Sequence, residues 1–177
     1  MKRGAAVRVL LVETLRGERQ RLSGLIEAAP ALSLAGVAAS GAEALDLAAR
    51  VRPSVIAINT QIYGSDGFAV SRLIMQACPA PIVLYGEQAD GPVVQQATAA
   101  GALTIVRRPG HSMAPGYDQE CALFVKTLEV MAGVPVVTRF AARTPAPSAP
   151  LGQPELLAIA ASTGGPGVVQ RIVGQLR

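Results

Sequence analysis

Ser162 is the residue of this sequence whose setting most directly suggests covalent chemistry. An apolar run at 156–160 predicts a strand and apolar residues at helical spacing over 168–176 predict a helix, so Ser162 stands on the turn between them. A serine at the head of a helix lies near unpaired amides and the positive end of the helix dipole, which favours a nucleophile. Its neighbours would form the helix start and a candidate oxyanion-binding region: Thr163, Gly164 and Gly165. The alternative is that Ser162 or Thr163 only caps the helix.

The motif Ala-Ser-Thr-Gly-Gly-Pro at 161–166 resembles the opening of the catalytic domain of the chemotaxis methylesterase (CheB) family, which are protein-glutamate methylesterases and deamidases. The resemblance implies that Ser162 attacks the methyl ester of receptor glutamates, helped by a histidine and an aspartate. Both partners would fall beyond Arg177, and His111, the one histidine of the sequence, matches neither. A serine without its base keeps little reactivity, so we expect no esterase turnover from these residues alone.

A second group of polar residues belongs to the first 134 residues, where short apolar runs alternate with helical patterns. The predicted strands are 7–12, 32–38, 54–58, 82–85 and 103–106. The predicted helices are 16–28, 41–51, 67–77, 93–100 and 118–131. This alternation predicts an α/β fold with a doubly wound, five-stranded parallel sheet covered on both faces, because parallel strands need crossover connections.

In such sheets ligands bind outside the carboxyl ends of the strands, so the residues that follow each strand are the candidates for a site. They are Glu13, Thr14, Asn59, Gly86, Arg107 and Arg108. The layout resembles a response-regulator receiver domain, of flavodoxin-like fold, over about residues 7–131. The supporting motifs are Gly-Ala-Glu-Ala-Leu at 41–45, Ser-Asp-Gly at 65–67 and Gly-Ala-Leu-Thr-Ile-Val-Arg-Arg-Pro at 101–109.

The resemblance also implies what a working receiver would carry at these positions: two acidic residues, a phosphoaccepting aspartate, a hydroxyl residue and a lysine. This chain has Glu13 and Thr14, Asn59, Gly86 and Arg108 instead. An amide cannot form an acyl phosphate, a single carboxylate on a longer stem should hold Mg²⁺ poorly, and a planar guanidinium does not reproduce an ammonium. We therefore predict a degenerate receiver without phosphotransfer, with no cofactor and with weak or lost Mg²⁺ binding.

Two other interpretations of this pocket stay open. Arg107 and Arg108 could bind an anion together with amides at the strand ends. Asp66 is acidic and near the site, but it matches the loop aspartate that precedes a glycine in the receiver family, so we interpret it as a turn residue rather than a substitute phosphoacceptor.

Composition and length divide the chain into three parts. Residues 1–134 form the receiver-like domain, and 135–153 are rich in proline and alanine and predict a semi-rigid linker. Residues 154–177 would be an incomplete start of the methylesterase domain, because one strand and one helix bury too little surface to fold alone. In the family that the motifs resemble, a similar linker joins the two domains, and the unphosphorylated receiver covers the active site.

Global composition excludes several other classes of protein. Apolar residues make up 50% of the sequence and charged residues 16%, which is typical of a packed globular chain. No apolar run approaches the ~20 residues of a membrane span and no signal peptide is visible, so we expect a cytoplasmic protein without membrane insertion. The net charge is +4, but aromatic residues make up only 3%, which disfavours nucleic-acid binding. Cys78 and Cys121 are interpreted as buried small side chains.

Three hypotheses of function follow. The first is the regulatory front part of a CheB-like methylesterase in a chemosensory pathway, with chemoreceptors or other chemosensory proteins as partners. The second is a stand-alone pseudo-receiver that binds a partner protein, with homo-oligomers possible in either case. The third, an unrelated anion- or nucleotide-binding domain, is disfavoured because Val-Glu-Thr-Leu at 12–15 stands where a glycine-rich phosphate loop would follow the first strand.

Overall fold

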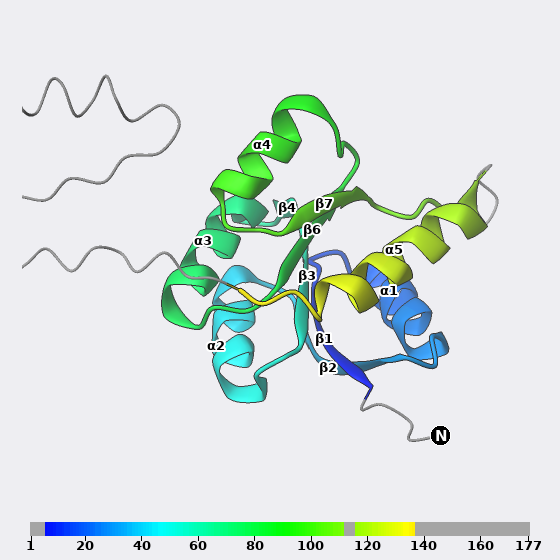
Figure 1. Ribbon diagram of the computed structural model, residues 1–177, viewed down its shortest axis with the longest axis horizontal. Helices are drawn as coiled ribbons and strands as arrows, with labels where there is room; N and C mark the ends of the chain where they lie inside the picture. The colour runs from blue at the N-terminus through cyan, green and yellow to red at the C-terminus, as the bar shows by residue number, and fades with distance from the viewer. Residues whose placement is uncertain (1–5, 112–115, 137–177) are drawn as a thin grey trace, which may run out of the picture. The chain divides into compact units, whose positions relative to one another are not determined.

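The computed structural model describes residues 6–111 and 116–136, and these residues form alternating strands and helices around one central sheet (Figure 1). The strands are β1 (Val7–Val12), β2 (Leu32–Ala38), β3 (Val55–Asn59), β4 (Gln61–Ile62), β5 (Ser65–Asp66), β6 (Ile82–Gly86) and β7 (Thr104–Arg107). The helices are α1 (Arg16–Ala28), α2 (Gly41–Val51), α3 (Gly67–Ala77), α4 (Gly91–Ala99) and α5 (Tyr117–Met131).

The central sheet has five parallel strands in the order β2-β1-β3-β6-β7. The chain first adds β2 on one side of β1 and then continues through β3 on the other side, so a topological switch point lies between β1 and β3. The carboxyl ends of these two strands are where ligands bind in open sheets of this kind. The predicted doubly wound five-stranded fold is confirmed.

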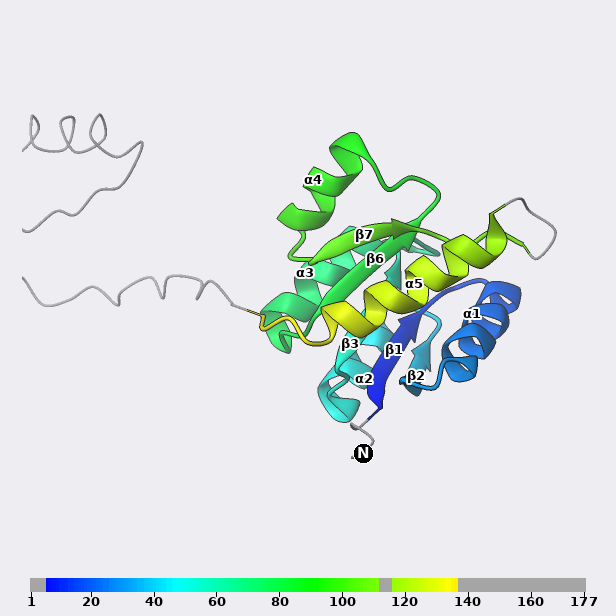
Figure 2. The same cartoon turned by 45° about the vertical axis from the view of Figure 1, so that its right-hand side comes forward.

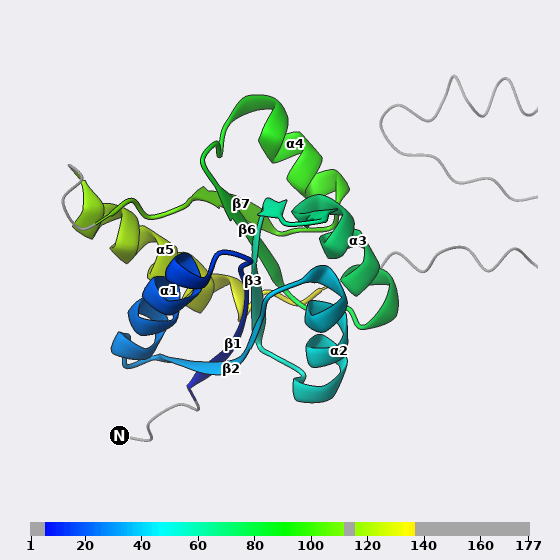
Figure 3. The ribbon, with the colours of Figure 1, turned by 180° about the vertical axis from the view of Figure 1, so that it is seen from behind.

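Helices cover both faces of the sheet, α1 and α5 on one face and α2, α3 and α4 on the other (Figures 2 and 3). On the first face, Leu22 of α1 and Phe124 of α5 pack against buried residues of β1, β3 and β6. On the second face, Ile74 of α3 packs against the side chains that alternate with those, such as Ile56 and Leu84. Strands buried on both faces explain why the sequence shows continuous apolar runs rather than alternation.

Five of the ten predicted elements have the predicted bounds at both ends, and the boundaries that differ in the other five do so by one or two residues. The largest shift is at α4, which begins at Gly91 rather than at residue 93, because Pro92 fits the first turn of a helix, where its missing N–H costs no hydrogen bond. Strands β3, β6 and β7 each extend one residue further than predicted, so Asn59, Gly86 and Arg107 are the last residues of their strands rather than the first residues after them.

The sequence analysis assigned no helix or strand between β3 and α3, but the segment forms a short antiparallel hairpin of β4 and β5. Gly64 allows the turn because it has a positive φ of 73°. Asp66 ends the hairpin and caps α3, since its carboxylate accepts a hydrogen bond from the N–H of Phe68 at 3.1 Å. Gly67 must be small, because a Cβ there would overlap the carbonyl oxygen of Asn59. Both ends of the hairpin therefore lie beside the end of β3 at Asn59.

Candidate functional site

Glu13 lies where the strands of the central sheet have their carboxyl ends, and it contacts several of the other residues found there. It directly follows β1 and its side chain is fully buried, although it is a carboxylate. One carboxylate oxygen, Oε1, accepts a hydrogen bond from the N–H of Leu15 at 3.0 Å. The other, Oε2, accepts from the amide Nδ2 of Asn59 at 2.7 Å and from the hydroxyl of Tyr85 at 3.1 Å. Three donors therefore compensate for the water that this buried charge has lost.

Asn59 uses both ends of its amide. Its Nδ2 donates to Glu13, and its Oδ1 accepts from the backbone N–H of Gln61 at 2.9 Å, where the hairpin begins. Only 3% of the residue is exposed. An ionised aspartate could accept the second of these bonds but could not donate the first, because it carries acceptors only. The amide at position 59 is thus matched to the carboxylate at position 13.

Tyr85 connects this pair to the helical layer on one face of the sheet. Its hydroxyl is within hydrogen-bonding distance of two acceptors, the Val12 carbonyl and Glu13 Oε2, both at 3.1 Å. Its ring packs edge to face on Phe124 of α5, with centroids 5.5 Å apart. Burial, and next the negative charge of Glu13, raise the pKa of Tyr85 well above its usual value, so the phenol keeps its proton and acts as a donor.

Thr14 and Arg19 tie the loop after β1 to its surroundings. The Thr14 hydroxyl accepts a hydrogen bond from the N–H of Tyr63 at the hairpin, at 3.1 Å. Arg19 of α1 donates from Nη1 to the carbonyl oxygens of Glu13 and Thr14, at 3.2 and 2.7 Å. In a working receiver this loop would supply two carboxylates to a metal. Here hydrogen bonds from Arg19 and Tyr63 hold it in place.

These contacts do not fit a Mg²⁺ site of the kind that receivers use. Mg²⁺ needs hard oxygen ligands in near-octahedral geometry, commonly one or two carboxylates with waters. Of Glu13, Thr14 and Asn59, only Glu13 carries a carboxylate, and hydrogen-bond donors already face both of its oxygens. Among the described residues no group of three His, Cys, Asp or Glu side chains is placed to hold a metal ion.

Gly86 and the two arginines lie further along the same edge of the sheet. Gly86 is buried at the end of β6, and its carbonyl oxygen accepts a hydrogen bond from the N–H of Arg108 at 2.7 Å. The guanidinium of Arg108 lies 3.4 Å from the exposed carboxylate of Glu87, an ion pair of the kind that contributes little to stability. Arg107 is the last residue of β7 and is exposed.

Both arginines line a cavity of about 270 Å³ at this edge. Three carboxylates line it as well: Glu18, Glu87 and Glu120. Burial acts to raise the pKa of Glu18, but the hydrogen bond and charge of Arg21 outweigh it, so the pKa lies below its usual value and Glu18 stays ionised. His111, also in the lining, lies 3.5 Å from Glu18. The mixed charges disfavour the hypothesis of an anion site based on Arg107 and Arg108.

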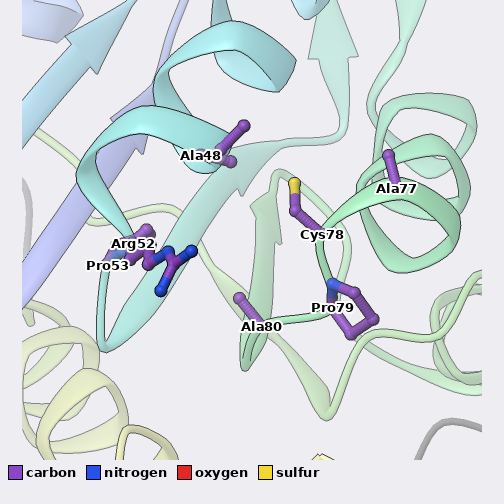
Figure 4. Close-up of a pocket in the computed structure, with 8 residues that line it drawn as sticks. Ala48, Arg52, Pro53, Ala77, Cys78, Pro79 and Ala80 are labelled. Carbon is purple, nitrogen blue, oxygen red and sulfur yellow. The ribbon is translucent and has the colours of Figure 1, made fainter.

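A larger cavity, of about 480 Å³, opens at the opposite edge of the sheet, where α2 and α3 end (Figure 4). Its lining is mostly alanine and proline, with the half-buried thiol of Cys78 and the side chain of Arg52. Burial raises the pKa of Cys78, which keeps the thiol protonated. This cavity contains none of the residues that the sequence singled out as a site.

The structure thus brings Glu13 and Asn59 into direct contact at the carboxyl ends of β1 and β3; the sequence had placed both residues in one pocket without predicting this hydrogen bond. Sequence reasoning missed Tyr85 and Arg19. A hydroxyl-bearing aromatic residue inside an aliphatic strand was the available signal for Tyr85, because a buried Tyr O–H needs an acceptor. The other predicted site, Ser162 with Thr163, Gly164 and Gly165, lies outside the described residues, as do nearly all of the linker and the whole of 154–177. Within the described residues no helix is long and apolar enough to cross a membrane.

Comparison with known proteins gives relatives for nearly the whole chain, although no family model matches it. It is 35% identical to protein-glutamate methylesterase/protein-glutamine glutaminase 4 of Myxococcus xanthus, over 96% of this chain and 51% of that protein. It is 36% identical to protein-glutamate methylesterase/protein-glutamine glutaminase 3 of Anaeromyxobacter dehalogenans, over 96% of this chain and 52% of that protein. The chain therefore spans about half the length of the curated relatives it matches.

Solved structures match the fold of the described residues. The response regulator domain of Thermotoga maritima CheB superposes with a TM-score of 0.66 at 22% identity, over 73% of this chain and 98% of that domain. The signal receiver domain of a DNA-binding response regulator from Colwellia psychrerythraea superposes with a TM-score of 0.57 at 20% identity, over 71% of this chain and 97% of that domain. The predicted flavodoxin-like receiver fold is confirmed.

Proposed function

The chain belongs to the protein-glutamate methylesterase (CheB) family, of whose curated members it spans about half the length, and on that premise we propose that it is the regulatory receiver part of such an enzyme, with a receiver that accepts no phosphate. The whole enzyme would hydrolyse glutamate methyl esters and deamidate glutamine in chemoreceptors of a chemosensory pathway. Ser162 would be its nucleophile, completed by a histidine and an aspartate from the remainder of the catalytic domain.

The observation that carries the proposal for the receiver is the 2.7 Å hydrogen bond from Asn59 Nδ2 to Glu13 Oε2. Phosphorylation of a receiver requires a carboxylate nucleophile and a cation that neutralises the phosphoryl oxygens. Asn59 has a neutral amide, which is a poor nucleophile. Its nitrogen faces Glu13, the one carboxylate among residues 13, 14 and 59. The same contacts support weak or lost Mg²⁺ binding as part of the proposal.

A mass measurement tests this proposal. The purified chain is incubated with acetyl phosphate, with Mg²⁺ and separately with EDTA, and its intact mass is recorded; a receiver that does accept phosphate, treated in parallel, shows that the reagent is active. We expect no mass increase of the chain under either condition. A hydroxylamine-sensitive phosphate adduct that requires Mg²⁺ would overturn the proposal and direct attention to Asp66 and Glu13 as acceptors.

A further inference from the structure

Thr60 is fixed at the end of β3, directly after Asn59. Its N–H donates to the carbonyl of Tyr85 on β6 at 2.9 Å, and its own carbonyl accepts from the N–H of Gly67 at 3.0 Å. The backbone of Thr60 is therefore held from two sides. Threonine is also β-branched, so its χ1 angle has few allowed values, and the direction of its side chain is restricted as well.

The side chain of Thr60 covers Gly86 on the neighbouring strand. A Cβ built on Gly86 would overlap Thr60 Oγ1 and would lie 3.4 Å from both the Cβ and the Cγ2 of Thr60. Gly86 is not among the described glycines with positive φ, so its backbone does not require glycine. The requirement for glycine at position 86 comes from the neighbouring side chain and not from the local conformation.

We propose that Thr60 and Gly86 form one steric unit, in which the Thr60 side chain occupies the space at the end of β6 and excludes any side chain from position 86. The inference rests on the proposed function, because position 86 is where a working receiver would carry its hydroxyl residue. On this view Thr60 determines which residue types position 86 can accept. Restoring Asn59 to aspartate and Gly86 to serine would not rebuild a receiver unless Thr60 were also made smaller.

A double-mutant cycle of Thr60→Ala and Gly86→Ala, measured by urea unfolding followed by circular dichroism, tests the unit. Gly86→Ala alone should lower the folding equilibrium constant by at least about tenfold, the usual order for overpacking. In the Thr60→Ala background the same change should lower it by less than about threefold, because the nearest Thr60 atom would then be the Cβ, in ordinary contact at 3.4 Å. Gly86→Ser should follow the same pattern, with loss alone and rescue by Thr60→Ala.

Two conservative variants separate the steric role from a general effect on the edge of the sheet. Thr60→Val keeps the branched shape without the hydroxyl, so Gly86→Ala should remain as damaging in it as in the wild-type chain. Thr60→Ser keeps the hydroxyl but can rotate, and should relieve part of the loss. An equal effect of Gly86→Ala in the wild-type and Thr60→Ala backgrounds would overturn the proposal. This outcome is distinguishable from failure of the proposed function, which a phosphate adduct on the unmodified chain would reveal whatever the cycle gives.

Discussion

Replacement of Asn59 by aspartate restores the residue type of a phosphoacceptor, but the structure predicts that it destabilises the fold. In Asn59→Asp the donor that lies 2.7 Å from Glu13 Oε2 becomes a second carboxylate oxygen. Both side chains are buried, with 0% and 3% of Glu13 and Asn59 exposed, so water cannot screen the repulsion. The change therefore replaces a hydrogen bond with a like-charge pair.

The size of the loss can be bounded in two ways. Two unit charges about 3 Å apart repel by about 5 kcal/mol at an effective dielectric constant of about 20. The loss cannot exceed the cost of protonating one of the two carboxyls. An ordinary carboxyl has a pKa of about 4, so keeping it protonated at pH 7, about three pH units higher, costs about 4 kcal/mol. The new carboxylic acid can then donate to Glu13 and recover part of a hydrogen bond. We expect Asn59→Asp to lose about 3–4 kcal/mol of unfolding free energy at pH 7.

The pH dependence of this loss has a definite sign. The paired carboxyl holds its proton to a higher pH in the folded state than in the unfolded state, so the folded state binds more protons above pH ~4. Stability of the variant should therefore fall, relative to wild type, as pH rises from about 4, and the deficit should shrink at acid pH. A divalent cation bound by the two carboxylates should reduce it too, so Mg²⁺ should stabilise the variant and EDTA should reverse the effect.

Urea unfolding at pH 5 and pH 8, with and without Mg²⁺, measures each of these effects. Gln61→Glu is the matched control, because it adds one negative charge at an exposed position two residues away and should change stability by less than about 0.5 kcal/mol. The double variant Glu13→Gln with Asn59→Asp reverses the donor and acceptor of the same contact and should recover most of the loss. If Asn59→Asp were within about 1 kcal/mol of wild type at pH 8 in EDTA, the reasoning about the buried pair would be wrong.

Two further substitutions test the contacts around the pair. Tyr85→Phe should lose about 1–3 kcal/mol of unfolding free energy in urea, because Glu13 and the Val12 carbonyl lose a buried donor. The pKa of Tyr85 is raised in the folded state, so the wild type should also lose stability more steeply than the variant as pH rises above about 10. Parallel pH profiles of the two proteins would contradict this. Gly67→Ala should lose more than about 2 kcal/mol in the same assay, because its Cβ would overlap the Asn59 carbonyl. Its control, Gly24→Ala, lies exposed within α1 with no neighbouring atom within 4 Å and should gain about 0.5–1 kcal/mol; equal effects of the two alanines would refute the steric argument.

The sequence predicted the sheet well because the signal is local. Each strand of the central sheet is a short, mostly apolar run, and each helix carries its own periodicity. The hairpin of β4 and β5 was missed because two residues per strand are too few for alternation to be visible, and its polar sequence is also typical of a loop. The boundary of α4 was missed because proline reads as a helix breaker when its place in the first turn is unknown.

The sequence predicted which residues lie at the carboxyl ends of the strands, but not the contacts that their side chains make. Asn59 and Glu13 are 46 residues apart in the chain, and their places at adjacent strand ends were enough to place both in one pocket. The contact of Tyr85 with Glu13 spans 72 residues, and it depends on which face of β6 the ring occupies. Thr60 carried no signal at all, because its effect on Gly86 exists only once β3 and β6 lie side by side.

The substitutions at the carboxyl edge are consistent with one another in a way that independent losses need not be. A site with several carboxylates needs a cation, whereas a single buried carboxylate needs donors, and Asn59, Tyr85 and the Leu15 N–H supply three. With no second carboxylate in this loop, the hydroxyl of Thr14 is free to accept from the hairpin at Tyr63. Each residue therefore suits the pocket that the others create. It follows that Asn59→Asp or Gly86→Ser made alone should lower stability before it restores any chemistry, since the first leaves a buried charge without a donor and the second a side chain without space.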